Sequence, residues 1–472
     1  MRSLFPPLDP GIRLELNGLI SLIDKVFPLP RRFRAALPND VAELSRLFTS
    51  ERGNRCLSYL GKPNILSAYL RYFLPWNVYR LCRLLPSLPL DLKDGDCIID
   101  LGSGPLTFVI ALWLSRPDLR SCSLEFLCLD RTALVLEAGK KVFSALAARE
   151  AAAEKGKTGE NLISDGAAGK DAGCKWNIRI MKGEISGKGI RCTKNHKKVF
   201  IHSEKVFHGK PAALVCAVNV FNEIFREFSS VDRIGVKNFA EQSARLLGLY
   251  GKNGHILVAE PGIPGSGEFI SRLRSSFLEQ GLELVSPCIH REACPFPGGM
   301  DSWRGVHTPP FRAFKKGMYP ESNTLREQHT PSLQGGVVDS KKNKAKWCHF
   351  SFDTDDAPKE LLKLSAAAMI PKERAVLSFL LVRNLLSDSQ NSKEKAVQKD
   401  SIYKALIISD SFPVGSYFCR YACSCIGVIL VRSSREKMEA LCSGTYAELK
   451  ISDQRDPKSG AIIGNYFYDG SQ

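Results

Sequence analysis

Two glycines and two acidic residues form the first candidate ligand site in this sequence. The run Asp100–Pro105 (Asp-Leu-Gly-Ser-Gly-Pro) follows an apolar segment and precedes a helical stretch, and Asp130 ends the next apolar segment. Glycines let the backbone turn sharply and approach a ligand, and an acid one strand later can bind both hydroxyls of a ribose. The candidate cofactor-binding residues are Asp100, Gly102, Ser103, Gly104 and Asp130.

The composition of this turn indicates which nucleotide it would bind. A dinucleotide-binding turn needs a third glycine near position 107, where the sequence has Thr107. An acid just before a Gly-x-Gly turn is instead typical of methyltransferases. The turn therefore favours S-adenosylmethionine over NAD; the alternative is an ordinary strand-to-helix turn of any α/β protein.

A second candidate site is the segment Asn219-Val220-Phe221-Asn222-Glu223, after the expected fourth strand. Enzymes that methylate amines usually carry Asn/Asp-Pro-Pro-aromatic here, and this segment contains no proline. Asn222 could hydrogen-bond to the edge of a base and Glu223 could accept a proton, which makes them candidate catalytic residues. Equally, both could cap the following helix.

Cysteines form the third candidate site. Cys288, Cys294 and Cys348 are joined near the C-terminus by Cys419, Cys423 and Cys425. Four thiolates can hold a zinc ion or an iron–sulfur cluster. No Cys-x-x-Cys pair is present, so on spacing alone these residues could equally be small buried apolar side chains.

Cys294 precedes a proline and could instead be a nucleophile that attacks C6 of cytosine. Such nucleophiles normally follow the fourth strand, whereas Cys294 comes after the fifth strand and its helix. We therefore set this reading below the metal site.

The elements expected to position these residues form an α/β fold. Residues 39–85 are predicted to be helical, and residues 96–285 alternate apolar strands with helices, as in a doubly wound sheet. Segments 147–174 and 296–346 are poor in large apolar residues and are predicted to be insertions. The predicted strands are 97–101, 124–129, 213–218 and 255–259.

Charge and cysteine content restrict the class of protein. The 472 residues carry a formal net charge of +17, which favours a polyanionic partner because neutralised phosphates release counterions. The basic segments are Arg31-Arg32-Phe33-Arg34, Lys194 with Lys197-Lys198, and the lysines of 341–346; each could also be a solvated loop. The odd number of cysteines, 15, and the prolines near the start predict a reducing compartment and no secretory signal.

Together these segments resemble one family, the methyltransferase-like proteins of the mitochondrial small ribosomal subunit and their bacterial relatives. The resemblance covers about residues 37–430 without the two insertions. The most specific segments are Pro287-Cys288-Ile289-His290 to Cys294-Pro295, and Trp347-Cys348-His349-Phe350. The other matching segments are 37–45 with Arg52, 68–72, 100–105, 221–224, 260–262 and 374–383.

The resemblance implies a fold, a metal group and a partner. It implies a Rossmann-like methyltransferase core and a [4Fe-4S] cluster held by Cys288, Cys294, Cys348 and Cys423, with Cys419 or Cys425 as alternatives to Cys423. Its partner would be ribosomal RNA of the small ribosomal subunit, with ribosomal proteins possible, in ribosome assembly or translation. The expected regions are N-terminal helices (1–90), the core (91–285), a cysteine metal-site region (286–390) and a strand-rich C-terminal region (391–472).

Other functions stay open at this stage. One is a non-catalytic RNA-binding assembly factor, and another is a small-molecule methyltransferase with a structural zinc. We expect a bacterial cytoplasmic protein, with the mitochondrial matrix as the alternative. Two positions depart from the family: Leu106 replaces a frequent glycine, and the terminal Trp-Gly-Asp has no clear counterpart at 464–466.

Overall fold

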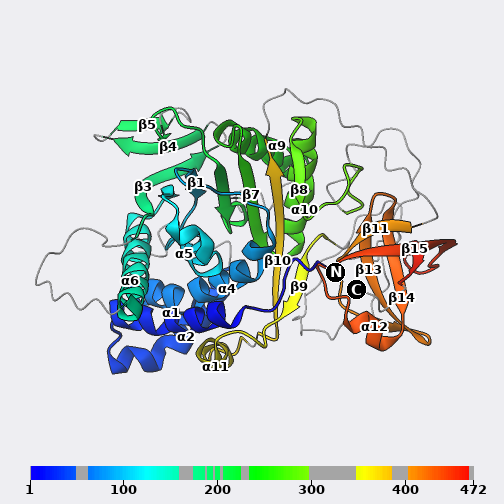
Figure 1. Ribbon diagram of the computed structural model, residues 1–472, viewed down its shortest axis with the longest axis horizontal. Coiled ribbons are helices and arrows are strands. Elements are labelled where there is room, and N and C mark those ends of the chain that lie inside the picture. Colours follow the sequence, from blue (N-terminus) through cyan, green and yellow to red (C-terminus); the bar gives the residue numbers. More distant parts are fainter. Residues whose placement is uncertain are drawn as a thin grey trace, which may run out of the picture.

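The computed structural model describes most of the chain. The described residues are 2–48, 62–158, 174–186, 189–194, 197–201, 206–224, 233–296, 347–370, 372–384 and 402–466. Nearly all of the predicted second insertion, 296–346, lies outside them. Figure 1 shows a group of helices, a central sheet with helices on both faces, and a separate set of strands at the C-terminal end. Among the described residues, no helix is long and apolar enough to span a membrane.

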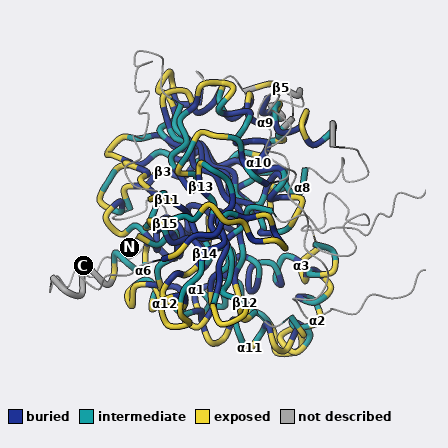
Figure 2. The backbone as a smooth tube through the Cα atoms, turned by 90° about the vertical axis from the view of Figure 1, so that its right-hand side faces the viewer, coloured by how far each residue is buried: buried dark blue, intermediate teal, exposed yellow. Residues whose placement is uncertain are grey.

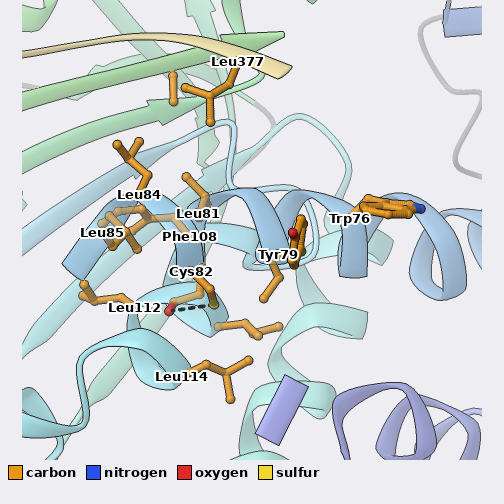
Figure 3. Close-up of a cluster of buried hydrophobic side chains, with 14 of the residues drawn as sticks. Trp76, Tyr79, Leu81, Cys82, Leu84, Leu85, Phe108, Leu112, Leu114 and Leu377 are labelled. Carbon is orange, nitrogen blue, oxygen red and sulfur yellow. Dashed lines mark hydrogen bonds between the residues drawn. The ribbon is translucent and has the colours of Figure 1, made fainter. Parts of the chain in front are cut away.

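The N-terminal region is helical, as predicted, but it begins earlier than residue 39. Its helices are α1 (Pro10–Val26), α2 (Arg31–Phe48), α3 (Pro63–Ala68), a π-helical turn (Tyr69–Phe73) and α4 (Leu74–Leu84). The side chain of Asp9 caps α1 by accepting from the N–H of Gly11. Helix α4 packs on α5 (Thr107–Ser115), where the thiol of Cys82 donates to the carbonyl of Ala111 (Figure 3). This contact places the N-terminal helices beside the glycine turn, which directly precedes α5.

The central sheet has the strand order β5-β4-β3-β2-β1-β6-β7-β10-β8, and β9 pairs with β10. Strands β3, β2, β1, β6 and β7 are parallel, whereas β10 is antiparallel to both β7 and β8. The strands are β1 (Cys97–Leu101), β2 (Glu125–Asp130), β3 (Asn177–Ser186), β4 (Gly189–Lys194), β5 (Lys197–Ile201), β6 (Leu214–Val218), β7 (His255–Pro261), β8 (Glu283–Ser286), β9 (Phe350–Asp353) and β10 (Arg374–Arg383).

Helices cover both faces of this sheet, so its central strands are buried and lack the alternation of a half-exposed strand (Figure 2). One face packs against α1, α4, α5 and α6 (Ala133–Thr158), the other against α9 (Arg233–Tyr250) and α10 (Pro264–Glu279). The four strands predicted from sequence are all present.

Helix α6 continues through residue 158, into the first part of the predicted insertion 147–174, because alanine, glutamate and lysine are strong helix formers even without large apolar side chains. Residues 159–173 lie outside the described part of the chain. The antiparallel extension of the sheet by β4 and β5 was not predicted.

The C-terminal strands form a closed barrel. Strand β11 (Ile402–Ile407) pairs with both β15 (Tyr446–Arg455) and β13 (Tyr417–Ser424), which closes the order β11-β15-β16-β14-β13. Strands β14 (Gly427–Ser433) and β16 (Ile462–Asn465) are parallel, and the short helix α12 (Arg435–Glu439) connects β14 to β15. This order, with its one parallel pair and its helix before the fourth barrel strand, is that of an OB-fold. The short strand β12 (Phe412–Val414) extends the edge beside β13.

The two sides of β13 contact different cores. Ala422 points into the barrel interior, which α12 closes with Met438. Cys419, Tyr421 and Cys423 point outward and belong to the large apolar cluster that includes the N-terminal helices and part of the sheet. The outer side of β13 is therefore covered by other parts of the chain.

Arg83 of α4 joins three segments that are distant in sequence. Its side chain is 2% exposed and donates to both carboxylate oxygens of Asp356, each at 2.9 Å, and to the carbonyl of Phe5 at 3.0 Å. The segment containing Phe5 also pairs with the barrel, because the N–H of Leu4 donates to the carbonyl of Gly444. One buried guanidinium thus ties the helices and the barrel to the connection between β9 and α11 (Lys359–Ala367).

Replacing Arg83 should therefore destabilise the protein strongly. We expect Arg83→Met to lower the free energy of unfolding by about 3–5 kcal/mol, because Asp356 would keep a largely buried and unpaired charge. The matched control is Arg245→Met, which removes an exposed ion pair with Glu241 and should cost at most about 0.5 kcal/mol. Urea unfolding followed by circular dichroism measures both. Equal losses would show that Arg83 does not hold the segments together.

Candidate functional site

The glycine turn adopts a conformation that its residues make possible. Gly102 and Gly104 have φ values of +66° and +53°, in the left-handed region that favours glycine. A Cβ on Gly102 would lie 2.4 Å from Cγ2 of Val220, whereas a Cβ on Gly104 would meet only the hydroxyl of Tyr69, at 3.9 Å. Gly102 is thus needed for close packing inside the protein, and Gly104 leaves open space at the carboxyl ends of the strands.

Leu106 shows how the turn tolerates a residue with a Cβ at a position suited to glycine. It has a φ of +58°, the conformation for which glycine is best suited, and this costs about 1–2 kcal/mol for a residue with a Cβ. Its side chain is fully buried, and full burial of a leucine contributes about 1.5–3 kcal/mol. Apolar packing therefore offsets the backbone strain.

Asp130 and Ser103 hold the turn together. The carboxylate of Asp130 accepts from the N–H groups of Gly104 at 3.1 Å and Thr132 at 2.8 Å. Burial raises the pKa of Asp130, and these backbone donors oppose the shift. The hydroxyl of Ser103 donates to the carbonyl of Asp100 at 2.8 Å, so it stabilises the turn.

Asp100 is an almost fully buried acid of the candidate cofactor site, at 1% exposure. Burial raises its pKa to about 7, and the thiol of Cys216 lies 3.3 Å from Oδ1. Its Oδ2 has no hydrogen-bond partner among the described residues. A buried oxygen without a partner is costly, so this atom is suited to receive a donor from a ligand or a bound water.

A buried carboxylate positions the second candidate segment. Glu260, at the end of β7, accepts from the N–H groups of Val220 at 3.1 Å, Phe221 at 2.8 Å and Asn222 at 3.1 Å. Burial raises its pKa to about 8, while the three donors act in the opposite direction. From the sequence, Glu260 was expected only as part of the turn 260–262 that resembles the family. Its role in holding this segment was not predicted, because the backbone groups that it binds lie about forty residues earlier.

The two candidate catalytic residues have different surroundings in the short helix α8 (Phe221–Ile224). The side-chain oxygen of Asn222 is buried and has no partner among the described residues. Glu223 lies 3.9 Å from the guanidinium of Arg131, the residue after Asp130. Glu223 thus has an ionic partner, whereas the side-chain oxygen of Asn222 has none among the described residues. Asn222 is therefore the better placed of the two to contact a ligand.

The four cysteines proposed as metal ligands line one pocket. Cys288 and Cys294 come from the loop after β8, Cys348 from the segment before β9, and Cys423 from β13 of the barrel. The remaining lining residues are Arg274, Pro287, Ile289, His290, Phe296, Leu406 and Ile408. The two alternatives to Cys423 do not line the pocket: Cys419 is buried elsewhere, and Cys425 is exposed.

Burial acts on three of the pocket thiols. Burial raises the pKa of Cys288, and it raises those of Cys348 and Cys423 well above the usual value. All four cysteines are free thiols, and Nε2 of His290 lies 3.5 Å from the sulfur of Cys423. The described residues contain no group of three or more His, Cys, Asp or Glu side chains placed to bind a single metal ion.

Comparison with known proteins adds only distant structural likeness. No family model matches the sequence, and no curated protein does either. One solved structure that resembles it is a methyltransferase from Geobacter sulfurreducens in complex with S-adenosyl-L-homocysteine, with 16% identity and a TM-score of 0.24. The match covers 44% of this chain and 65% of that chain, which is less than two thirds of its length. A second is a precorrin-6y C5,15-methyltransferase from Geobacter metallireducens, with 11% identity and a TM-score of 0.21, covering 42% of this chain and 70% of that one. A third is a methyltransferase from Aquifex aeolicus, with 11% identity and a TM-score of 0.20, covering 41% of this chain and 76% of that one.

The strand order decides the fold. Methyltransferases that use S-adenosylmethionine typically have five parallel strands, then one antiparallel strand, then a last strand at the edge. This sheet has that order: β3, β2, β1, β6 and β7 are parallel, and β10 lies antiparallel between β7 and β8. The core has a Rossmann-like methyltransferase fold. In such open α/β sheets, ligands bind at the carboxyl ends of the strands, where the glycine turn and Asp130 lie.

The cysteine pocket is attached directly to this methyltransferase core. The indole N–H of Trp347 donates to the carbonyl of Gly262 at 3.0 Å, and the hydroxyl of Ser378 in β10 donates to the carbonyl of Cys348 at 2.8 Å. Gly262 is two residues beyond Glu260, which holds the Asn222 segment. The turn after β7 therefore contacts both candidate sites.

The contact between Gly102 and Val220 predicts a difference between two glycine substitutions. Gly102→Ala and Gly95→Ala both place a Cβ at a positive φ, but only Gly102 has a neighbour in its way. We expect Gly102→Ala to lower the free energy of unfolding by about 1–3 kcal/mol more than Gly95→Ala, owing to overpacking. Urea unfolding measures the difference. Equal effects would show that Val220 moves aside and does not fix the turn.

Proposed function

We propose that this protein is an S-adenosylmethionine-dependent methyltransferase-like factor that acts on ribosomal RNA of the small ribosomal subunit and carries a [4Fe-4S] cluster. The observation that carries the proposal is the pocket in which Cys288, Cys294, Cys348 and Cys423 meet beside a methyltransferase core. Three separate segments supply these cysteines, and the sequence resemblance implies the same four residues as ligands.

The turn between β1 and α5 suits S-adenosylmethionine. Asp130 would accept from the ribose hydroxyls, the space beside Gly104 admits a ligand, and Oδ2 of Asp100 needs a donor. When bound, this cofactor supplies a methyl group that is already activated. The chain then has to orient an acceptor and exclude water, which is largely a matter of proximity.

The Asn222 segment would orient that acceptor. Glu260 fixes three successive backbone N–H groups, so the segment is held before a ligand arrives. The partnerless side-chain oxygen of Asn222 could then accept from an exocyclic amine of a nucleobase. The amide nitrogen of Asn222 also offers donors, so the side chain can hydrogen-bond either to a donor or to an acceptor on a nucleobase.

The cysteine pocket suits a cluster better than a single zinc ion. Zinc would require four sulfurs at about 2.3 Å from one point, whereas an iron–sulfur cube carries its thiolates around its outside. The four cysteines surround a pocket, and no described group is placed for a single ion. Buried Arg274 lines the same pocket and favours an occupant of net negative charge.

Two features support RNA as the partner. The first is the net charge of +17, which favours a polyanion. The exposed start of α2 presents Arg31, Arg32 and Arg34 around Phe33, which is 46% exposed and lies under the guanidinium of Arg32. Exposed aromatic and basic side chains together favour unpaired nucleotides. The lysines of 341–346, and the side chains of Lys194, Lys197 and Lys198, lie outside the described part.

The cluster is tested by metal analysis of protein purified without oxygen. We expect about four iron and four sulfide per chain and a broad visible absorption near 400 nm, as is general for this cluster type. Cys288→Ser should lose most of the iron, because the thiolate is the metal ligand. The control is Cys442→Ser, an exposed cysteine outside the pocket, which should keep it.

Two results would contradict this part of the proposal. One zinc per chain without sulfide would identify a structural zinc site and weaken the family assignment. A metal-free wild-type protein would exclude the cluster and leave a basic methyltransferase core.

Function is tested with small-subunit ribosomal RNA and radiolabelled S-adenosylmethionine. We expect RNA binding that weakens steeply with salt, and methyl incorporation into the RNA. Asp130→Asn should weaken cofactor binding about 10- to 100-fold, since a hydrogen bond to a charged group contributes about 1.5–3 kcal/mol. Asp118→Asn, an exposed acid in a different loop, is the control.

The same assay separates the alternative functions. RNA binding without incorporation, under conditions where the cofactor binds, would identify a non-catalytic assembly factor. Cofactor binding without RNA binding would favour a small-molecule methyltransferase.

A further inference from the structure

Arg274 of α10 holds the loop that carries two of the pocket cysteines. Its side chain is 3% exposed. One terminal nitrogen, Nη2, donates to the carbonyls of His290 and Glu292, both at 2.7 Å. Both carbonyls lie between Cys288 and Cys294. The guanidinium is therefore part of the wall that sets the distance between these two thiols.

The charge of Arg274 is unbalanced in the described structure. Arg272, two residues earlier and equally buried, pairs with the carboxylate of Glu268 at 3.0 Å. No carboxylate among the described residues pairs with Arg274. Its ionisable neighbours are the pocket thiols Cys288, Cys348 and Cys423, together with His290.

An unpaired buried cation is costly, and an anion in contact with it removes much of that cost. Four thiolates on an iron–sulfur core would supply such an anion, because the assembly is negatively charged and gains one further negative charge on reduction. The pocket thus places a buried positive charge beside the four cysteines that would hold this group.

We propose that Arg274 is a positioning residue with two roles toward the cluster: it holds the Cys288–Cys294 loop through its two carbonyl contacts, and its charge favours the reduced cluster. This inference rests on the proposed iron–sulfur cluster and adds a residue outside the ligand set. The charge raises the reduction potential, because a nearby cation stabilises the more negative state. The carbonyl contacts slow the loss of iron.

Two substitutions separate the roles. Arg274→Gln removes the charge, and Arg274→Lys keeps a charge but replaces the planar guanidinium, whose Nη2 donates to both carbonyls, by an ammonium on a different stem. We expect Arg274→Gln to shift the midpoint potential of the cluster to a more negative value. We expect Arg274→Lys to keep the potential close to that of wild type and to lose iron to a chelator several times faster than wild type does. Arg272→Gln, on the same helix, should leave the potential unchanged.

The measurements are an anaerobic redox titration of the full-length protein followed by electron paramagnetic resonance, and iron release to a ferrous chelator. If the wild-type protein has a cluster and Arg274→Gln has the same midpoint potential, the charge role is overturned and the proposed cluster stands. An unchanged rate of iron release in Arg274→Lys would overturn the positioning role. A wild-type protein without iron would overturn both this inference and the proposed cluster. If Arg274→Gln does not fold, a potential in Arg274→Lys far from that of wild type would still contradict the charge role.

Discussion

Three backbone N–H groups converge on the buried carboxylate of Glu260, and much of the candidate site depends on this one interaction. It fixes Val220, whose side chain fills the space that only a glycine at 102 leaves open. Through Val220, the end of β7 sets the position of the glycine turn, and through Asn222 it sets the candidate acceptor segment. Loops held by a buried charge are ordered before a ligand binds, which reduces the entropic cost of binding.

The same turn explains why the cysteine pocket is next to the methyltransferase core. Gly262 binds the indole of Trp347, and Cys348 follows directly in the chain. Strand β10 then runs antiparallel along β7 and holds the carbonyl of Cys348 through Ser378. The extra antiparallel strand of the sheet thus anchors one pocket cysteine, and the loop held by Arg274 supplies two more. The barrel supplies the last.

The sequence predicted those features that depend on local pattern. The buried strands, the glycine turn and the acid of Asp130 all follow from short runs of residue types, and the structure has them where they were expected. Glu260 and Arg274 were missed as site residues because their roles come from backbone groups 16 to 40 positions away. The barrel was expected only as strands, since its order depends on which strands pair and not on their composition. The helix over residues 147–158 was not predicted, because that segment lacks the large apolar side chains that mark a helix packed on a core.

The barrel completes the pocket with the surface that such barrels usually offer to ligands. OB-folds commonly bind oligonucleotides on the outer face of their second and third strands, which here are β13 and β14. In this protein Cys419, Tyr421 and Cys423 on that face are packed into the main core, and Cys423 faces the pocket. RNA bound by this chain would therefore contact other surfaces, such as the basic start of α2. The metal site would then hold the barrel against the core, so its occupancy and the docking of the barrel would depend on each other.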